Sequence, residues 1–255
     1  MLNDVFQISR WGARAFAAGL FMAAITLPAH AQLDASRLLK SSDRARGGGM
    51  PGLSWEVSAF NKGGNGDEQN MRLRIKAVDT ASVAETLEPP RSRGAKMLQS
   101  ERNMWLTKPG LKKPIPISPR QRLTGQAAVG DIAATNYARD YEPKLLAEER
   151  INDELCYVLE LTAKDRNTTY DRLLYWVSAE RGVGVRAEFF SLSGKRLKRA
   201  DFEYNNTILF KGRTMPFISR MGISDELTDA RTLLEYSNIS VQAIPRADFD
   251  VSHLE

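Results

Sequence analysis

Residues 101–125 read ERNMWLTKPGLKKPIPISPRQRLTG and set a limit on the fold. A short apolar run with a tryptophan, 103–106, is followed by a basic segment that is rich in proline. Its prolines are Pro109, Pro114, Pro116 and Pro119. Proline fixes φ and has no backbone N–H, so this segment cannot lie in a helix interior or a central strand. We therefore predict that it runs along the edge of a sheet as a stiff rim, past which a ligand enters.

The sequence on both sides of this rim has the pattern of short β-strands. In 71–77, for example, Met71, Leu73 and Ile75 alternate with basic residues, which predicts a half-buried strand. Similar segments occupy 53–60, 83–87, 94–99, 155–161, 170–177, 183–189, 198–204 and 231–241.

The expected helices are few, and they decide how the strands connect. Only 33–43 and 129–137 have helical spacing, so the crossover helices of a parallel sheet are missing. We predict a mainly β (α+β) fold of ten or eleven strands, in which a long antiparallel sheet curls on itself.

The N-terminus has the three parts of a secretory signal peptide. Two arginines precede the apolar run 15–29, AFAAGLFMAAITLPA, and Ala29-His30-Ala31 supplies small residues for cleavage. The apolar run is shorter than the roughly 20 residues of a membrane-spanning helix. We predict that 1–31 is removed by cleavage before Gln32, and that 32–255 forms a single domain. Since position 32 is not a cysteine that could carry a lipid, we expect a soluble mature protein.

Composition excludes several functional classes. The chain has 255 residues, and its net charge of +5 lacks the clustered excess of a nucleic-acid binder. Its single cysteine, Cys156, excludes an internal disulfide. His30 leaves with the signal peptide and His253 is third from the end, so a histidine-based triad and a His/Cys metal site both lack residues. We therefore expect that the protein is not an enzyme, that it binds no metal or cofactor, and that it has no nucleic-acid partner.

The concave face of a curled sheet is filled either by side chains or by a ligand. Large apolar residues of the predicted strands are candidates for the lining of a ligand cavity, and they are equally candidates for an ordinary core. They are Trp55, Trp105, Tyr157, Leu159, Trp176, Phe189, Phe202 and Phe217. Period two alone does not say which face is concave.

The rim is the candidate for a ligand entrance. Its basic residues predict contact with lipid phosphates or an acidic partner, or else a solvated loop. Together with the helix at 129–137, the rim is expected to act as a movable lid over the cavity. The residues assigned to rim and lid are Lys112, Lys113, Arg120, Arg122, Ile132 and Tyr137.

Several motifs together resemble the outer-membrane lipoprotein-sorting (LolA-like) family. The first group surrounds the rim and consists of Asn103-Met104-Trp105, Ile117-Ser118-Pro119-Arg120-Gln121-Arg122, Gly125 and Gly130-Asp131. The second group lies in the later strands and consists of Glu154–Leu161, Tyr175-Trp176-Val177, Ser193-Gly194-Lys195 and Leu197-Lys198. The similarity runs from about Leu53 to Val241. The chain departs from the family after Gly125, where relatives carry a Gly-Ser-Asp-Phe run and this sequence has Gln126-Ala127-Ala128.

This resemblance implies an incomplete antiparallel β-barrel, closed on one side by a few helices around an apolar cavity. It also implies a periplasmic carrier that moves a lipid or lipoprotein acyl chain between an inner-membrane transporter and an outer-membrane acceptor. Relatives of this type are linked with exporters of the resistance-nodulation-division class. The family pattern would place Trp105 at the inner face and 112–122 at the mouth of the cavity.

Two alternatives stay open at this point. The first is a non-catalytic structural or adaptor subunit of an envelope assembly, whose interior is filled by side chains and whose basic rim meets a protein partner. The second is an enzyme with carboxylate chemistry, which needs a close Asp/Glu pair that no spacing in the sequence predicts.

Overall fold

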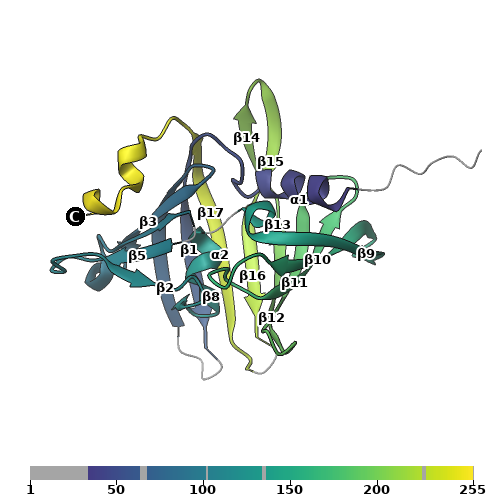
Figure 1. Ribbon diagram of the computed structural model, residues 1–255, viewed down its shortest axis with the longest axis horizontal. Coiled ribbons are helices and arrows are strands. Elements are labelled where there is room, and N and C mark those ends of the chain that lie inside the picture. Colours follow the sequence, from purple (N-terminus) through teal and green to yellow (C-terminus); the bar gives the residue numbers. More distant parts are fainter. Residues whose placement is uncertain (1–33, 64–67, 102, 134–135, 226–227, 255) are drawn as a thin grey trace, which may run out of the picture. The chain divides into compact units, whose positions relative to one another are not determined.

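A computed structural model describes residues 34–63, 68–101, 103–133, 136–225 and 228–254 (Figure 1). These residues belong to one unit of the chain, Asp34–Glu255. The predicted signal peptide, 1–31, and the cleavage site before Gln32 lie outside the described residues.

One antiparallel sheet of 13 strands dominates the fold. Its N-terminal half consists of β1 (Leu53–Lys62), β2 (Glu68–Ala77), β3 (Ala81–Glu88), β4 (Lys96–Ser100), β5 (Asn103–Thr107) and β6 (Ile115–Ile117). Its C-terminal half consists of β9 (Tyr141–Ile151), β10 (Glu154–Ala163), β11 (Arg172–Ser178), β12 (Gly184–Phe190), β13 (Arg196–Glu203), β16 (Arg220–Ser224) and β17 (Arg231–Val241).

The order of the strands confirms an antiparallel meander that stays open. It runs β6-β5-β4-β3-β2-β1-β17-β16-β13-β12-β11-β10-β9, and the pairing of β1 with β17 joins the two halves. The strands β6 and β9 are the two edges, so the sheet does not close into a barrel. Because β6 contains Pro116, which cannot donate a backbone hydrogen bond, the predicted position of this segment at a sheet edge is confirmed.

The register shows why the alternating sequence forms these strands. Trp55 of β1 lies opposite Ile75 of β2, and Val57 lies opposite Leu73, so apolar side chains meet on one face. Arg74 points to the other face, where its Nη2 lies 3.2 Å from a carboxylate oxygen of Glu56. A shift by one residue would turn every apolar side chain outward, and the pattern therefore fixes the pairing.

The remaining elements lie beside or over this sheet. They are the hairpin of β14 (Asn206–Phe210) and β15 (Arg213–Phe217), the short pair β7 (Arg122–Thr124) and β8 (Ala127–Ala128), the helices α1 (Ala35–Arg44), α2 (Val129–Ala133) and α3 (Tyr137–Asp140), and the 3-10 turns η1 (Pro90–Ser92), η2 (Arg246–Phe249) and η3 (Val251–His253).

The helices differ in part from the prediction. The helix expected at 33–43 is α1, which begins after Asp34 because the Asp34 carboxylate accepts the backbone N–H of Ser36 at 2.9 Å. The single helix expected at 129–137 is wrong, since α2 and α3 are separate helices there. Asn136 caps α3 by accepting the N–H of Arg139 at 3.0 Å, which starts a new helix at that point.

The main core lies on the inner face of the sheet, beneath the three helices. The helix α1 contacts α3, β9 and β11, while α2 contacts β3. The turn η2, which follows the last predicted strand, packs against β3 and β4 on the outer face. The sequence patterns did not predict this C-terminal cover.

Candidate functional site

The inner face of the sheet brings together most of the residues that were predicted to line a cavity. Five of them share one buried apolar cluster, namely Trp55, Leu159, Phe189, Phe202 and Phe217. Tyr157 points to the same face because it lies opposite the buried Val177, and it is half-buried. Pairs of aromatic rings pack edge to face in this cluster, such as Trp55 with Phe217 at a centroid distance of 6.1 Å.

Two predicted lining residues lie on the opposite, outer face. Trp105 is paired with Leu98 and packs in a separate cluster with Phe249, so its expected place at the inner face is not observed. Trp176 also belongs to an outer cluster, and its indole N–H donates to the Glu149 carboxylate at 2.8 Å. Side chains alternate between the faces of a strand, so the register decides these positions and the sequence pattern does not.

The predicted lid residues Ile132 and Tyr137 are buried in the inner cluster, at 1% and 5% exposure. The Tyr137 ring packs edge to face against Tyr141 and Tyr175, with centroid distances of 5.5 Å in both cases. The helices α2 and α3 therefore form part of the core as well as its cover.

A buried polar network fixes α2 to the sheet. Lys198 on β13 donates to Asp131 of α2 and to the backbone carbonyl of Gln126 at 2.7 Å. The Tyr170 hydroxyl and the N–H of Ala128 also donate to Asp131, at 2.9 Å and 2.8 Å. The network satisfies both oxygens of Asp131, so this end of the cover is firmly attached.

The rim is attached at one basic residue and exposed at others. Arg120 forms a two-pronged ion pair with Asp171, at 2.7 Å and 3.0 Å, and its Nε donates to the carbonyl of Thr168. Lys112 and Lys113 are exposed. Arg122 begins β7, and its side chain is not among the described ones.

The interior also contains two ionisable residues, Asp43 and Arg46, that the sequence patterns did not single out. Asp43, near the end of α1, accepts the N–H of Ala138 at 2.7 Å, and burial raises the pKa of Asp43 to about 7. The guanidinium carbon of Arg46 lies 4.5 Å from the ring centroid of Tyr137 and 5.1 Å from that of Phe202. Both residues fall where the sequence shows only a helix end and a glycine-rich turn, so no periodic signal revealed their burial.

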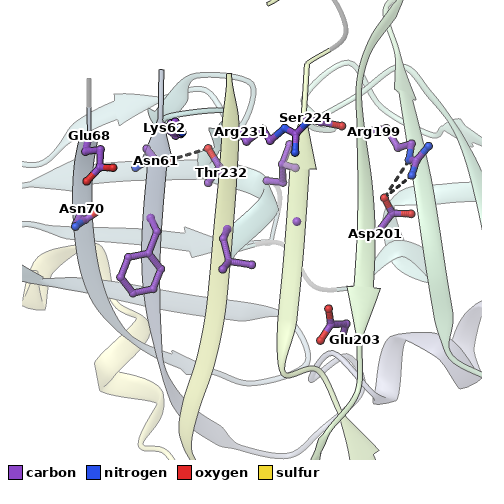
Figure 2. A pocket seen from close by; sticks show the side chains of 14 residues that line it. Asn61, Lys62, Glu68, Asn70, Arg199, Asp201, Glu203, Ser224, Arg231 and Thr232 are labelled. Atoms are coloured by element: carbon purple, nitrogen blue, oxygen red, sulfur yellow. Dashed lines mark hydrogen bonds and ion pairs between the residues drawn. The ribbon is translucent and has the colours of Figure 1, made fainter. Parts of the chain in front are cut away.

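The outer face carries a groove of about 730 Å³ (Figure 2). It crosses β2, β1, β17, β16 and β13, and Gly222 of β16 leaves its middle without a side chain. Phe60 and Leu233 supply apolar surface, while Arg199 and Asp201 form an ion pair at 2.8 Å within it. Because the groove is open and its charges are partly paired, it offers less shielding to an apolar ligand than the inner face does.

Within the described ranges, no three His, Cys, Asp or Glu side chains come together in a group that could hold a metal ion. The helices found in the same part of the chain include none with the length and apolar character needed to cross a membrane. The inner face is apolar and aromatic and includes a few buried polar groups, a composition typical of sites that bind apolar ligands.

An open antiparallel sheet with short helices over its apolar inner face is a LolA-like fold. A LolA superfamily protein from Nitrosomonas europaea shares 33% identity with this chain, with a TM-score of 0.76 over 85% of this chain and 97% of that protein. The chain therefore belongs to the LolA superfamily.

Other comparisons agree on the fold. A DUF1329 family protein from Desulfovibrio piger has a TM-score of 0.73 at 19% identity, over 87% of this chain and 98% of its own. A domain described as an outer membrane lipoprotein-sorting protein, from Vibrio parahaemolyticus, has the same TM-score and identity over 86% and 97%. A family model described as "Uncharacterized protein" matches residues 78–255. No curated protein matched the chain in a sequence search.

Proposed function

We propose that this protein is a periplasmic carrier, which binds the acyl chain of a lipid or lipoprotein at its inner face and transfers it between membranes. The observation that carries this proposal is the continuous apolar and aromatic inner face, covered by three short helices in place of a second sheet. A helical cover can move away from the sheet without breaking strand pairing. Membership in the LolA superfamily supports the same conclusion and favours a carrier over an enzyme.

The energetics suit reversible binding. Each methylene that is hidden from water contributes about 0.8 kcal/mol, so part of one acyl chain supplies several kcal/mol without any chemical step. Release then needs a competing apolar site in an acceptor or a change in the shape of the interior.

Entry of an acyl chain requires the cover to move. Phe202 packs edge to face against Tyr175, and Tyr137 of α3 packs against the same ring, so side chains occupy the centre of the inner face. We propose that α3 moves as the lid, together with the exposed part of the rim around Lys112 and Lys113. The end of the rim is held to α2, because the N–H groups of Val129 and Gly130 donate to the carbonyls of Gln121 and Pro119. Lys198 holds α2 through Asp131, which makes α2 the less mobile part of the cover.

The proposed route runs from an inner-membrane transporter, in particular an exporter of the resistance-nodulation-division class, to an outer-membrane acceptor. The predicted signal peptide would deliver the chain to the periplasm. The Vibrio parahaemolyticus domain, described as an outer membrane lipoprotein-sorting protein, supports this direction of transfer by likeness of fold.

Lipid analysis of the natively purified protein tests the proposal. We expect mass spectrometry to detect a co-purified lipid at about one molecule per protein. A photo-crosslinking amino acid at Ile132, on the inner side, should capture that lipid, while the same amino acid at Trp105, on the outer face, should not. Absence of lipid together with no capture at Ile132 would overturn the proposal.

A second candidate is a non-catalytic adaptor subunit of an envelope assembly. The groove of about 730 Å³ across the outer face favours it, since this groove leaves room for a protein partner while aromatic rings pack in the interior. Crosslinks from Phe60, which lies in the groove, to another envelope protein, without lipid at Ile132, would support the adaptor and contradict the carrier.

A further inference from the structure

The guanidinium of Arg46 is a buried cation without an opposite charge beside it. Arg46 is 2% exposed, and its guanidinium lies between the rings of Tyr137 and Phe202. Among the described residues, no carboxylate oxygen comes within ion-pair distance of Arg46, and its Nη1 has no hydrogen-bond partner. Aromatic faces compensate a buried cation only in part, so a full unpaired charge here is costly unless a further group binds to it.

A second unpartnered donor lies close to this guanidinium. The hydroxyl of Tyr175 is buried and has no hydrogen-bond partner among the described residues. Burial raises the pKa of Tyr175, and the positive charge of Arg46 acts in the opposite direction, which requires the two groups to be near each other. Arg46 Nη1 and the Tyr175 hydroxyl therefore lack a well-formed hydrogen bond, and the weak side-chain contacts of Tyr175 with Arg46 and Ser42 place the two groups together in the aromatic interior.

Asp43, the acidic residue nearest to Arg46 in the sequence, does not cancel this charge. Asp43 lies three residues before Arg46, one of its oxygens is bound to the N–H of Ala138, and the other has no partner in the described chain. Because burial raises the pKa of Asp43 to about 7, a large share of its carboxyl is protonated at neutral pH. The positive charge of Arg46 is thus left for another anion.

A pocket of about 460 Å³ leads from the surface to Asp43. It lies between the end of α1, the turn at 79–80 and the start of α3. Its lining includes the basic residues Lys40, Arg44 and Arg139 and the acidic residues Asp43 and Asp79, and Arg139 is paired with Asp140 at 2.9 Å. Because a large share of the Asp43 carboxyl is protonated and Arg139 is already paired, Lys40 and Arg44 against Asp79 leave a small positive excess, which attracts an anion to this side of the protein.

We propose that Arg46 anchors the singly charged oxyanion of the bound lipid, with the Tyr175 hydroxyl as second donor. The oxyanion is a carboxylate or a phosphodiester, since both present two oxygens to the fork of a guanidinium and both carry the one negative charge that one arginine balances. The acyl chain then lies along the aromatic residues of the inner face. This inference rests on the proposed carrier function and names the chemistry of its ligand.

The test compares three ligands with the same 12-carbon chain. They are dodecanoate, lauroyl lysophosphatidylglycerol and uncharged dodecanol, each titrated against the purified, delipidated protein by isothermal calorimetry. We expect at least one of the two anions to bind roughly 10- to 100-fold more tightly than dodecanol, the usual range for charge-assisted hydrogen bonds. The anion that binds more tightly than dodecanol identifies the headgroup as a carboxylate or a phosphodiester.

Three variants test which residues cause the tighter binding of the anion, called here the anion preference. Arg46→Met should abolish it while leaving the binding of dodecanol unchanged, and Tyr175→Phe should reduce it in part. Arg37→Met, which removes an exposed arginine of α1 that lies outside this pocket, is the matched control and should keep the preference. The lipid-free Arg46→Met protein should melt at the same temperature as wild type or higher, because an unpaired buried charge is removed; if it does not fold, Tyr175→Phe and Arg46→Lys decide the question.

The possible failures are distinct. Equal binding of all three ligands by the wild-type protein would overturn the role of Arg46 and leave the carrier function standing. The role of Arg46 is also overturned if the Arg46→Met protein still binds the anion more tightly than dodecanol. It is overturned as well if the Arg46→Met protein melts at a lower temperature than the wild type while the wild type shows no anion preference. Binding of none of the three ligands would overturn the carrier function, and the anion site with it.

Discussion

Lys198 on β13 and Asp131 on α2 form a buried ion pair, with Nζ 2.5 Å from Oδ2 and side-chain exposures of 7% and 1%. The Lys198 ammonium also lies 5.1 Å from the ring centroid of Tyr170, whose hydroxyl donates to the same carboxylate. These contacts connect the cover to a strand 67 residues further along the chain. Lys198, which points to the inner face from β13, therefore has a structural role in attaching α2 to the sheet.

Removal of this lysine should destabilise the protein strongly. Lys198→Met leaves the Asp131 carboxylate buried without its cation, which typically costs about 3–5 kcal/mol. Urea unfolding followed by tryptophan fluorescence measures this loss. Arg220→Ala is the control, because Arg220 pairs with Glu235 at the surface and such pairs contribute about 1 kcal/mol or less. Equal effects of the two substitutions would show that the buried pair is not important for stability.

Two glycines in strands should respond in opposite ways to alanine. A Cβ at Gly184 would lie 1.8 Å from the Tyr175 hydroxyl oxygen and 2.1 Å from its ring, so Gly184→Ala must displace a buried aromatic side chain. We expect a loss of at least about 1–3 kcal/mol, as for other overpacked cores. Gly222→Ala, with nothing within 4 Å, should be neutral or stabilising. Thermal unfolding of both variants checks this, and a stable Gly184→Ala protein would contradict the observed position of Tyr175.

Asp43 should make the stability depend on pH. Burial raises its pKa in the folded protein to about 7, from an ordinary value of 3.8, while the hydrogen bond from Ala138 and the charge of Arg46 oppose this rise. Between these pH values the unfolded chain loses the proton and the folded protein keeps it, so the contribution of Asp43 to stability falls as pH rises from about 4 to 7. The total fall is on the order of 4 kcal/mol, since each tenfold change in proton affinity is worth about 1.4 kcal/mol.

The Asp43→Asn variant isolates this effect, because asparagine can still accept the N–H of Ala138 and does not titrate. Urea unfolding at pH 4.5 and 7.5 should show a smaller decrease in the free energy of unfolding for Asp43→Asn than for wild type. All other carboxyl groups are shared by the two proteins and cancel in the comparison. Identical decreases would show that Asp43 is not protonated in the folded state.

The Arg120–Asp171 ion pair should control the mobility of the rim. Arg120→Ala removes two contacts to Asp171 and one to the carbonyl of Thr168, which hold the end of the rim against the start of β11. Since the pair is partly exposed, we expect global stability to change by about 1 kcal/mol or less. Hydrogen exchange of amides in 108–125 should nevertheless become faster. Lys112→Ala, at an exposed position of the same rim, should leave the exchange unchanged.

Much of the fold follows from local rules. Alternating apolar residues specify strands wherever one face is buried, as in 71–77, and the prolines of the rim exclude it from the middle of a sheet. Both features act within a few residues, so they were readable from the sequence. The family motifs around Trp105 and Gly125 likewise indicated the LolA-like fold correctly.

Tertiary structure decided what the sequence pattern leaves ambiguous. Period two does not state which face of a strand points inward, and only the register placed Trp105 and Trp176 on the outer face. Burial of charge is also a long-range property, because Asp131 needs Lys198 from a distant strand and Arg46 becomes enclosed only when α3 and β13 meet around it. By itself the sequence therefore determined the strands, the sheet edge and the family, while the inner face and its buried charges required the packing of segments far apart in the chain.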